Sequence, residues 1–183
     1  LSLSKILRWK FLDTGFMYRA IALSTKEFIH FDNNFNSIKT ILCSANFSFD
    51  KSYPSKLLFN NKNLSLNIHT KDIDETTSKI SQIPQIRESL VNKQRKLAEQ
   101  FELVAAGRDV CTIVFPKAVF KFFLTASPEI RAKRRYRQLK IGNPNIKYDA
   151  ILTQINKRDE MDITRSISPL KPSSDSKLIN TDN

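Results

Sequence analysis

Two clusters of small and charged residues stand where predicted strands end. The segment 10–15 ends in D-T-G, and the apolar segment 103–106 is followed by G-R-D at 107–109. Ligands bind to α/β sheets just beyond the carboxyl ends of the strands. An arginine there suits a phosphate because its planar fork can reach two oxygens, and a carboxylate can accept hydrogen bonds from a base or sugar. Since G-R-D is also common in ordinary turns, this cluster alone leaves both interpretations open.

A second constellation is strongly basic. Residues 131–137 read R-A-K-R-R-Y-R, and on a helix Arg131, Arg134 and Arg135 share one side. Further along, Arg158, Asp162 and Arg165 are spaced i, i+4 and i+7, so that two cations bracket an anion. A solvated basic helix that binds RNA would explain the first run, and a surface salt bridge would explain the second.

The connection between these basic segments favours phosphate chemistry. Residues 141–144 read I-G-N-P, a flexible link that would allow two helices to close together. In phosphoryl transfer the transition state spreads negative charge over equatorial oxygens, so positioning and charge neutralisation do most of the work. An arginine-rich helical hairpin that closes over a triphosphate would provide both.

Composition supports an anionic partner and a reducing compartment. The formal charge is +12, from 30 Lys and Arg against 18 Asp and Glu, although part of this excess is scattered over the chain. Cys43 and Cys111 are too few for a disulfide framework, which favours the cytoplasm. No apolar run approaches the roughly 18 residues of a membrane span, so no membrane partner is expected.

The elements that must position these residues alternate between strand and helix. Apolar spacing predicts helices over 16–23 and from Pro84 onward, and S-P-E at 127–129 opens another helix. Residues 31–39 are polar and loop-like, and the tail from 166 to 183 is weakly structured by pattern. Strands are expected at 40–43, 47–49, 56–59, 64–66, 103–106 and 119–126. The first four predict a small antiparallel sheet, and the alternation as a whole predicts a layered α/β domain with a largely parallel sheet.

The motifs together resemble the cytidylate kinase family. Residues 11–19, F-L-D-T-G-F-M-Y-R, are similar to its Y-L-D-T-G-A-M-Y-R, and residues 107–116, G-R-D-V-C-T-I-V-F-P, to its G-R-D-I-G-T-V-V-F-P. F-L-T-A-S at 123–127 leads into R-A-K-R-R at 131–135, and R-D-E-M-D-I-T-R at 158–165 follows the family's R-D-x-x-D-x-x-R ending. The resemblance covers residues 10–28 and 78–181 in family order.

The resemblance implies a P-loop kinase-like fold and transfer of the γ-phosphoryl group of ATP, with Mg²⁺, to CMP or dCMP. One domain would span 1–183, with a nucleotide-monophosphate insert at 31–80 and an arginine-rich lid at 128–165. The implied acceptor residues bind the phosphate, the cytosine edge and the sugar: Thr14, Arg19, Ser78, Arg87, Arg108, Asp109, Arg158, Asp162 and Arg165. In the lid, Arg134 would meet the phosphates of ATP, and Arg134, Arg158, Asp162 and Arg165 form the implied catalytic set. A monomer is expected, with no metal site of its own.

One family element is missing from the printed residues. The phosphate loop G-x-x-x-x-G-K-[ST] needs two glycines, but the three glycines of this chain, Gly15, Gly107 and Gly142, lie elsewhere. We therefore expect a chain that begins after this loop and is poorly active. The alternatives are a basic nucleic-acid-binding module and an inactive remnant that still binds CMP.

Overall fold

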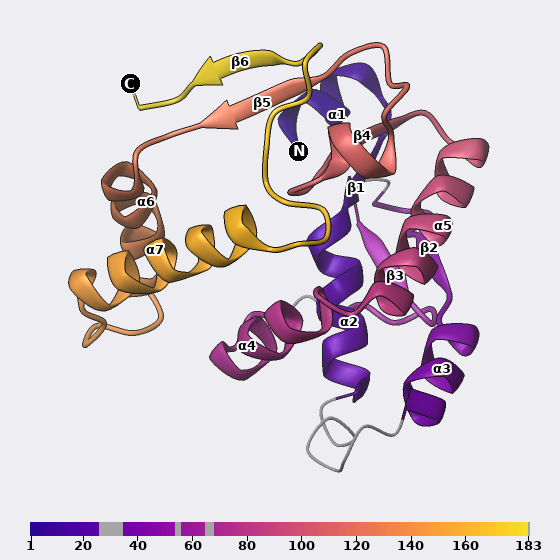
Figure 1. Cartoon of the computed structure of the whole chain (residues 1–183), viewed down its shortest axis with the longest axis horizontal. Coiled ribbons are helices and arrows are strands. Elements are labelled where there is room, and N and C mark those ends of the chain that lie inside the picture. The colour runs from indigo at the N-terminus through magenta and orange to yellow at the C-terminus, as the bar shows by residue number, and fades with distance from the viewer. Residues whose placement is uncertain (26–34, 54–55, 65–67, 183) are drawn as a thin grey trace. The chain divides into compact units, whose positions relative to one another are not determined.

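A computed structural model describes residues 1–25, 35–53, 56–64 and 68–182 of the chain (Figure 1). The chain divides into two compact units, Leu1–Val110 and Cys111–Asn183, and each is described by itself. The expectation of one domain with an insert at 31–80 and a lid at 128–165 stays a prediction.

The first unit is built around a parallel strand pair. Strand β1 (Lys10–Asp13) pairs with β4 (Leu103–Ala106), with Leu12 opposite Ala105. A short helix, α1 (Ser2–Leu7), precedes β1 and ends at Arg8, whose backbone is left-handed with φ of 58°. Because the two strands are parallel, their carboxyl ends meet at the same edge of the pair, and the D-T-G and G-R-D segments follow there.

Three helices in the long connection between β1 and β4 carry most of the core. They are α2 (Thr14–Thr25), α4 (Lys71–Ile80) and α5 (Pro84–Gln100). The predicted start of α5 is confirmed, since Pro84 occupies its first turn. Ile86, Leu90 and Leu97 of the predicted apolar stripe are buried, whereas Phe101 follows the helix and remains partly exposed. The core residues that are fully buried in this unit include Leu12, Met17, Ile21, Ile73, Ile86 and Leu90.

The predicted small antiparallel sheet is confirmed in part. Strands β2 (Phe47–Phe49) and β3 (Leu57–Phe59) pair antiparallel, with Ser48 opposite Leu58. The strand expected at 40–43 is wrong, because helix α3 (Phe35–Ser44) covers it. The loop expected at 31–39 is wrong over 35–39 for the same reason, and 31–34 lie outside the described residues. Ile38 and Leu42 explain the helix: they are four residues apart and both buried, as on one helical face. The strand expected at 64–66 lies largely outside the described residues.

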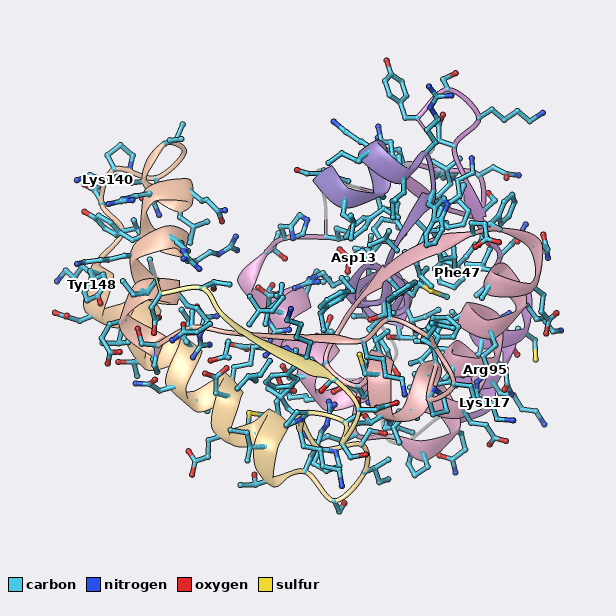
Figure 2. All side chains as sticks on the ribbon, turned by 90° about the horizontal axis from the view of Figure 1, so that it is seen from above. Asp13, Phe47, Arg95, Lys117, Lys140 and Tyr148 are labelled. Carbon is cyan, nitrogen blue, oxygen red and sulfur yellow. The ribbon has the colours of Figure 1, made fainter. Side chains whose placement is uncertain are left out.

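The second unit combines a parallel strand pair with a helical hairpin. Strand β5 (Phe122–Thr125) pairs with β6 (Lys177–Asn180), and Figure 1 shows the two arrows side by side. Helices α6 (Pro128–Lys140) and α7 (Tyr148–Thr164) form the hairpin, and Lys140 and Tyr148 lie near its turn in Figure 2. The start of α6 is as predicted: the Oγ of Ser127 accepts a hydrogen bond from the amide of Ile130, followed by Pro128 and Glu129.

The tail expected to be weakly structured contains β6, which corrects that prediction. The amide of Lys177 donates to the carbonyl of Lys121 at 2.9 Å, and the amide of Thr181 donates to that of Thr125 at 2.8 Å. The Nζ of the buried Lys121 lies 2.5 Å from Oδ2 of Asp175 and 2.6 Å from the carbonyl of Pro116. The backbone partners around β6 lie 56 residues away in the sequence, and Lys121 lies 54 residues from Asp175, so a local pattern cannot reveal them.

The α/β class predicted from the sequence is confirmed. Within the described residues, two strand pairs are parallel and one is antiparallel, which is consistent with a P-loop kinase-like fold. Across those same residues, none of the helices combines the length and apolarity needed to cross a bilayer.

Candidate functional site

The carboxyl end of β1 and the carboxyl end of β4 are joined at Thr14. Its buried hydroxyl donates to the carbonyl of Ala106 at 3.0 Å, and Asp13 Oδ1 accepts from the amide of Phe16 at 3.2 Å to start α2. There is no room for a larger residue at Gly107, because a Cβ there would lie 2.0 Å from Thr14 Oγ1. The hydroxyl of Thr14 therefore holds the two ligand-facing segments together.

Arg19 lies one helical turn beyond this junction and pairs with Asp74. Its Nε lies 3.3 Å and its Nη2 3.2 Å from Oδ1 of Asp74, and both side chains are largely buried. Arg19 also needs Gly15, since a Cβ on that residue would be 2.9 Å from Nη1. The pair ties α2 to α4 and holds a guanidinium close to the end of β1.

The most buried charges of the first unit belong to Arg87 and Asp109. Arg87 on α5 donates from Nη2 to Oδ2 of Asp109, which follows β4, and from Nη1 to the carbonyl of Ser81 at 2.9 Å. The ring of Tyr18 lies 5.6 Å from the guanidinium carbon. Since a buried carboxylate is stable only when paired, this arrangement orients Asp109 as a charged acceptor.

The other two residues predicted for the first unit are half-buried. Ser78 lies on α4, where its hydroxyl donates to the carbonyl of Asp74 at 3.0 Å, one turn earlier. Arg108 stands between Gly107 and Asp109, directly after β4. Thr14, Arg108 and Asp109 thus follow the two strands of this unit, and Arg19 lies on α2. That they form one ligand site stays a prediction.

In the second unit, Asp162 and Arg165 interact as their spacing predicts. Helix α7 ends at Thr164, so Arg165 is not on the helix but caps it with an extended backbone, and its Nη1 lies 3.3 Å from Oδ1 of Asp162. Its Nε donates to the carbonyl of Ser168. The predicted continuous face of Arg158, Asp162 and Arg165 is therefore corrected at its last residue, while the ion pair remains.

The arginines of α6 have partners that the sequence did not suggest. Arg131 binds Asp159 on α7 with both ends of its fork, at 3.0 Å from Nη1 to Oδ1 and 2.5 Å from Nη2 to Oδ2. Arg134 donates from Nη1 to Thr181 Oγ1 at 3.1 Å and from Nη2 to the Thr181 carbonyl. The first pair joins the hairpin helices, and the second joins α6 to the end of β6.

A carboxylate also caps the start of the hairpin. Oδ1 of Asp182 accepts from the amide of Ser127 at 2.6 Å, and this hydrogen bond lowers the pKa of Asp182 from its usual value. An anion at the first turn of a helix is favourable because the helix dipole is positive there. Asp182, which follows β6, therefore helps to fix the residue at which α6 begins.

Sequence reasoning found the charged ligand candidates but missed their partners. Asp74 lies outside the quoted motifs, and Asp159 lies inside R-D-x-x-D-x-x-R but was given no role of its own. Whether Arg19, Arg108 and Arg165 meet at one phosphate stays a prediction, because Arg165 belongs to the second unit.

The described residues offer no protein cage for a metal ion. Nowhere in the described part of the chain do three or more His, Cys, Asp or Glu side chains gather in an arrangement that could hold one. Mg²⁺ in kinases is commonly bound through substrate phosphates and one or two carboxylates, so a metal would be expected to arrive with its nucleotide.

Comparison with known proteins gives one consistent result. A family profile described as cytidylate kinase matches residues 1–183. A cytidylate kinase of Caldanaerobacter subterraneus subsp. tengcongensis is 41% identical over 180 residues, which cover 98% of this chain and 79% of that protein. Cytidylate kinases of Carboxydothermus hydrogenoformans and Shewanella piezotolerans are 37% and 36% identical, covering 98% and 99% of this chain and 81% and 80% of those proteins.

Proposed function

Because the chain belongs to the cytidylate kinase family, we propose that it binds CMP or dCMP and transfers the γ-phosphoryl group of ATP to that nucleotide, giving (d)CDP. The observation that carries this proposal is the buried Arg87–Asp109 pair beside the end of β4, within a chain of that family. The family is one of nucleoside monophosphate kinases, and the choice of CMP or dCMP as acceptor is the proposed part.

The acceptor nucleotide would be held by groups with separate tasks. Arg19, Arg108 and Arg165 would bind its phosphate, since guanidinium forks match phosphate oxygens. Asp109 would accept a hydrogen bond from the exocyclic amine of cytosine, and uracil, with a carbonyl at that position, would face the carboxylate with an acceptor. Arg87 and Ser78 would complete the recognition of the base, and Thr14 would position the nucleotide.

The transfer step would rely on electrostatics and not on a covalent intermediate. The acceptor phosphate oxygen forms the new bond to the γ-phosphorus as the bond from that phosphorus to the β,γ-bridging oxygen breaks, and ADP leaves. Arg134 would stabilise the ATP phosphates, while Arg158 and Asp162 would bind the acceptor sugar. Mg²⁺ would arrive with ATP as part of the substrate and would supply charge neutralisation to its phosphates.

The turnover of the 183 residues by themselves would be low. The chain has glycines only at positions 15, 107 and 142, so its sequence lacks the loop of backbone N–H groups that cradles ATP phosphates. Binding of CMP depends on other residues and would persist. A monomeric, cytoplasmic protein is part of the same proposal.

Calorimetric titration with CMP and UMP tests the proposal. CMP should bind at least tenfold more tightly than UMP, and Arg165→Ala should weaken CMP binding strongly while the protein stays folded. Arg137→Ala is the matched control, because Arg137 is an exposed arginine on α6 outside the proposed site. Equal affinity for CMP and UMP would refute the role of Asp109. Tight binding of an RNA oligomer without CMP binding would favour the basic nucleic-acid-binding module instead.

Catalysis needs a separate measurement. ADP formation with CMP, ATP and Mg²⁺ should be slow with these 183 residues alone. A longer chain that carries the phosphate loop, assayed separately, should form ADP faster. CMP binding with no ADP formation in either chain would identify an inactive remnant.

A further inference from the structure

The first unit contains a groove that none of the proposed kinase residues lines. It has a volume of about 370 Å³ and lies between helix α5 on one side and, on the other, β2 with the turn before it. Phe47 and Arg95 mark β2 and α5 in Figure 2. This volume falls in the range that small-molecule sites occupy, roughly 300–1,000 Å³.

Helix α5 presents two cations to this groove. Lys93, Lys96, Leu97 and Gln100 line it, and their spacing of i, i+3, i+4 and i+7 puts them on one helical face. From the opposite wall, Asn46 and Ser48 contribute an amide and a hydroxyl. Among the described residues, every side chain in the lining is neutral or basic, so neither lysine meets a carboxylate in the groove.

Lys93 lines the groove and is held by a hydrogen bond. Its Nζ donates at 2.8 Å to the carbonyl of Ala45, the residue that follows α3, and an ammonium has two further hydrogens to donate. Burial lowers the pKa of Lys93, the charge of Lys96 lowers it further, and Cys43 has an opposing effect. Two neighbouring ammonium groups that repel each other gain stability from an anion placed between them.

Besides Ala45 and Leu97, the apolar part of the groove contains three aromatic rings, of Phe47, Phe49 and Phe101. Phe49 and Phe101 pack edge to face with centroids 5.3 Å apart, and Phe47 packs on Phe59 at 5.3 Å. Nζ of Lys10 lies 5.8 Å from the ring of Phe49 and 5.6 Å from that of Phe101. Phe101 keeps 38% of its surface exposed, so the residue is partly accessible to a ligand.

We propose that this groove binds a small phosphate ester with a flat apolar body. The phosphate would lie between the ammonium groups of Lys93 and Lys96, and the apolar body would pack on Phe101 next to Phe49. Ser48, Asn46 and Gln100 supply further hydrogen-bonding groups for the remaining phosphate oxygens. A dianion suits the site better than a carboxylate because two cations are present. The groove is separate from the residues assigned to CMP and does not rest on the proposed kinase activity.

Titration of the ¹⁵N-labelled 183-residue chain with phenyl phosphate, followed by NMR, tests the proposal. Amide signals of residues 45–49 and 93–101 should shift in a saturable manner. Shifts of the Arg19 and Arg108 amide signals would instead indicate binding at the CMP site. Lys96→Gln removes one of the two charges without touching the hydrogen bond of Lys93 to Ala45. It should weaken binding of phenyl phosphate about tenfold, as expected for loss of a charged hydrogen bond. Lys79→Gln, an exposed lysine on α4, is the charge-matched control and should leave the affinity unchanged.

Two further probes identify the ligand. Inorganic phosphate should bind more weakly than phenyl phosphate, and equal affinities would refute the role of the aromatic rings. If CMP shifts the groove amides as phenyl phosphate does, the site accepts nucleotides, and if CMP shifts only the Arg19 and Arg108 signals, the ester is of another kind. No saturable shift of the groove amides with phenyl phosphate, or the same affinity in Lys96→Gln, would overturn the proposal.

Discussion

Arg87 and Asp109 form an ion pair whose side chains retain only 5% and 8% of their exposure, although they stand 22 residues apart in the sequence. Arg87 comes from the start of α5, and Asp109 follows β4, so the pair joins the long helix to the carboxyl end of the parallel strands. In the proposed acceptor site it would provide a buried charge, and removing one partner would leave the other charge uncompensated.

Asp109→Asn should destabilise the fold because it leaves the buried charge of Arg87 uncompensated. Losing one partner of a buried pair costs about 3–5 kcal/mol, and we expect the lower end since Arg87 keeps the carbonyl of Ser81 and the ring of Tyr18. Urea unfolding followed by circular dichroism measures the loss. The double variant Arg87→Met with Asp109→Asn should recover part of it, and a double variant as unstable as the sum of the two single ones would contradict the pairing.

Gly107→Ala should destabilise the protein by about 1–3 kcal/mol, the usual cost of overpacking. The added Cβ would lie 2.0 Å from Thr14 Oγ1 and 2.8 Å from Val110 Cγ2, so the hydrogen bond from Thr14 to Ala106 cannot survive. Thermal unfolding measures the effect. Combining it with Thr14→Ala removes the closer clash and should cost less than the sum, while simple additivity would show that the two residues do not meet.

Arg131→Lys should loosen the helical hairpin although it preserves the charge. Arg131 binds both oxygens of Asp159, and a lysine ammonium cannot reproduce this two-point contact. We expect a loss of about 1 kcal/mol, as for one hydrogen bond. Hydrogen exchange should then be faster in α6 and α7 and unchanged in α5. Arg135→Lys on the same helix is the control, and equal exchange in both variants would show that the pair is not important.

Acid should weaken the pairing of β6 with β5. The hydrogen bond from Lys121 lowers the pKa of Asp175, so its carboxylate is ionised in the folded state at pH values where an unfolded chain, with a pKa of about 3.9, is already partly protonated. The stabilisation is therefore present above about pH 4 and is lost as the pH falls through the lowered folded pKa.

Amide exchange of Lys177–Asn180 between pH 6 and pH 3, corrected for intrinsic rates, measures this dependence. In Asp175→Asn the protection of β6 should be lower at pH 6 and should depend less on pH, apart from the contribution of Asp182, whose pKa is also lowered. A wild-type strand whose protection does not change over this range would show that the ion pair with Lys121 contributes nothing to β6.

The sequence alone determined the elements and motifs whose signals are local. The start of α5 at Pro84 and the start of α6 at Ser127 depend on residues within one turn, and β4 follows from a short apolar run before a glycine. The ordered D-T-G, G-R-D and R-A-K-R-R segments were likewise sufficient to identify the family. Such features can be read directly because neighbours in the chain are also neighbours in space.

Only the tertiary structure decided which charges meet. Asp74 pairs with Arg19 across 55 residues and Thr181 with Arg134 across 47, and β6 forms in a tail whose pattern predicted little order. A guanidinium can bind any carboxylate or carbonyl that the chain brings within about 3 Å. Its partner is therefore set by the path of the backbone and the packing of the core, which residue types and spacing do not encode locally.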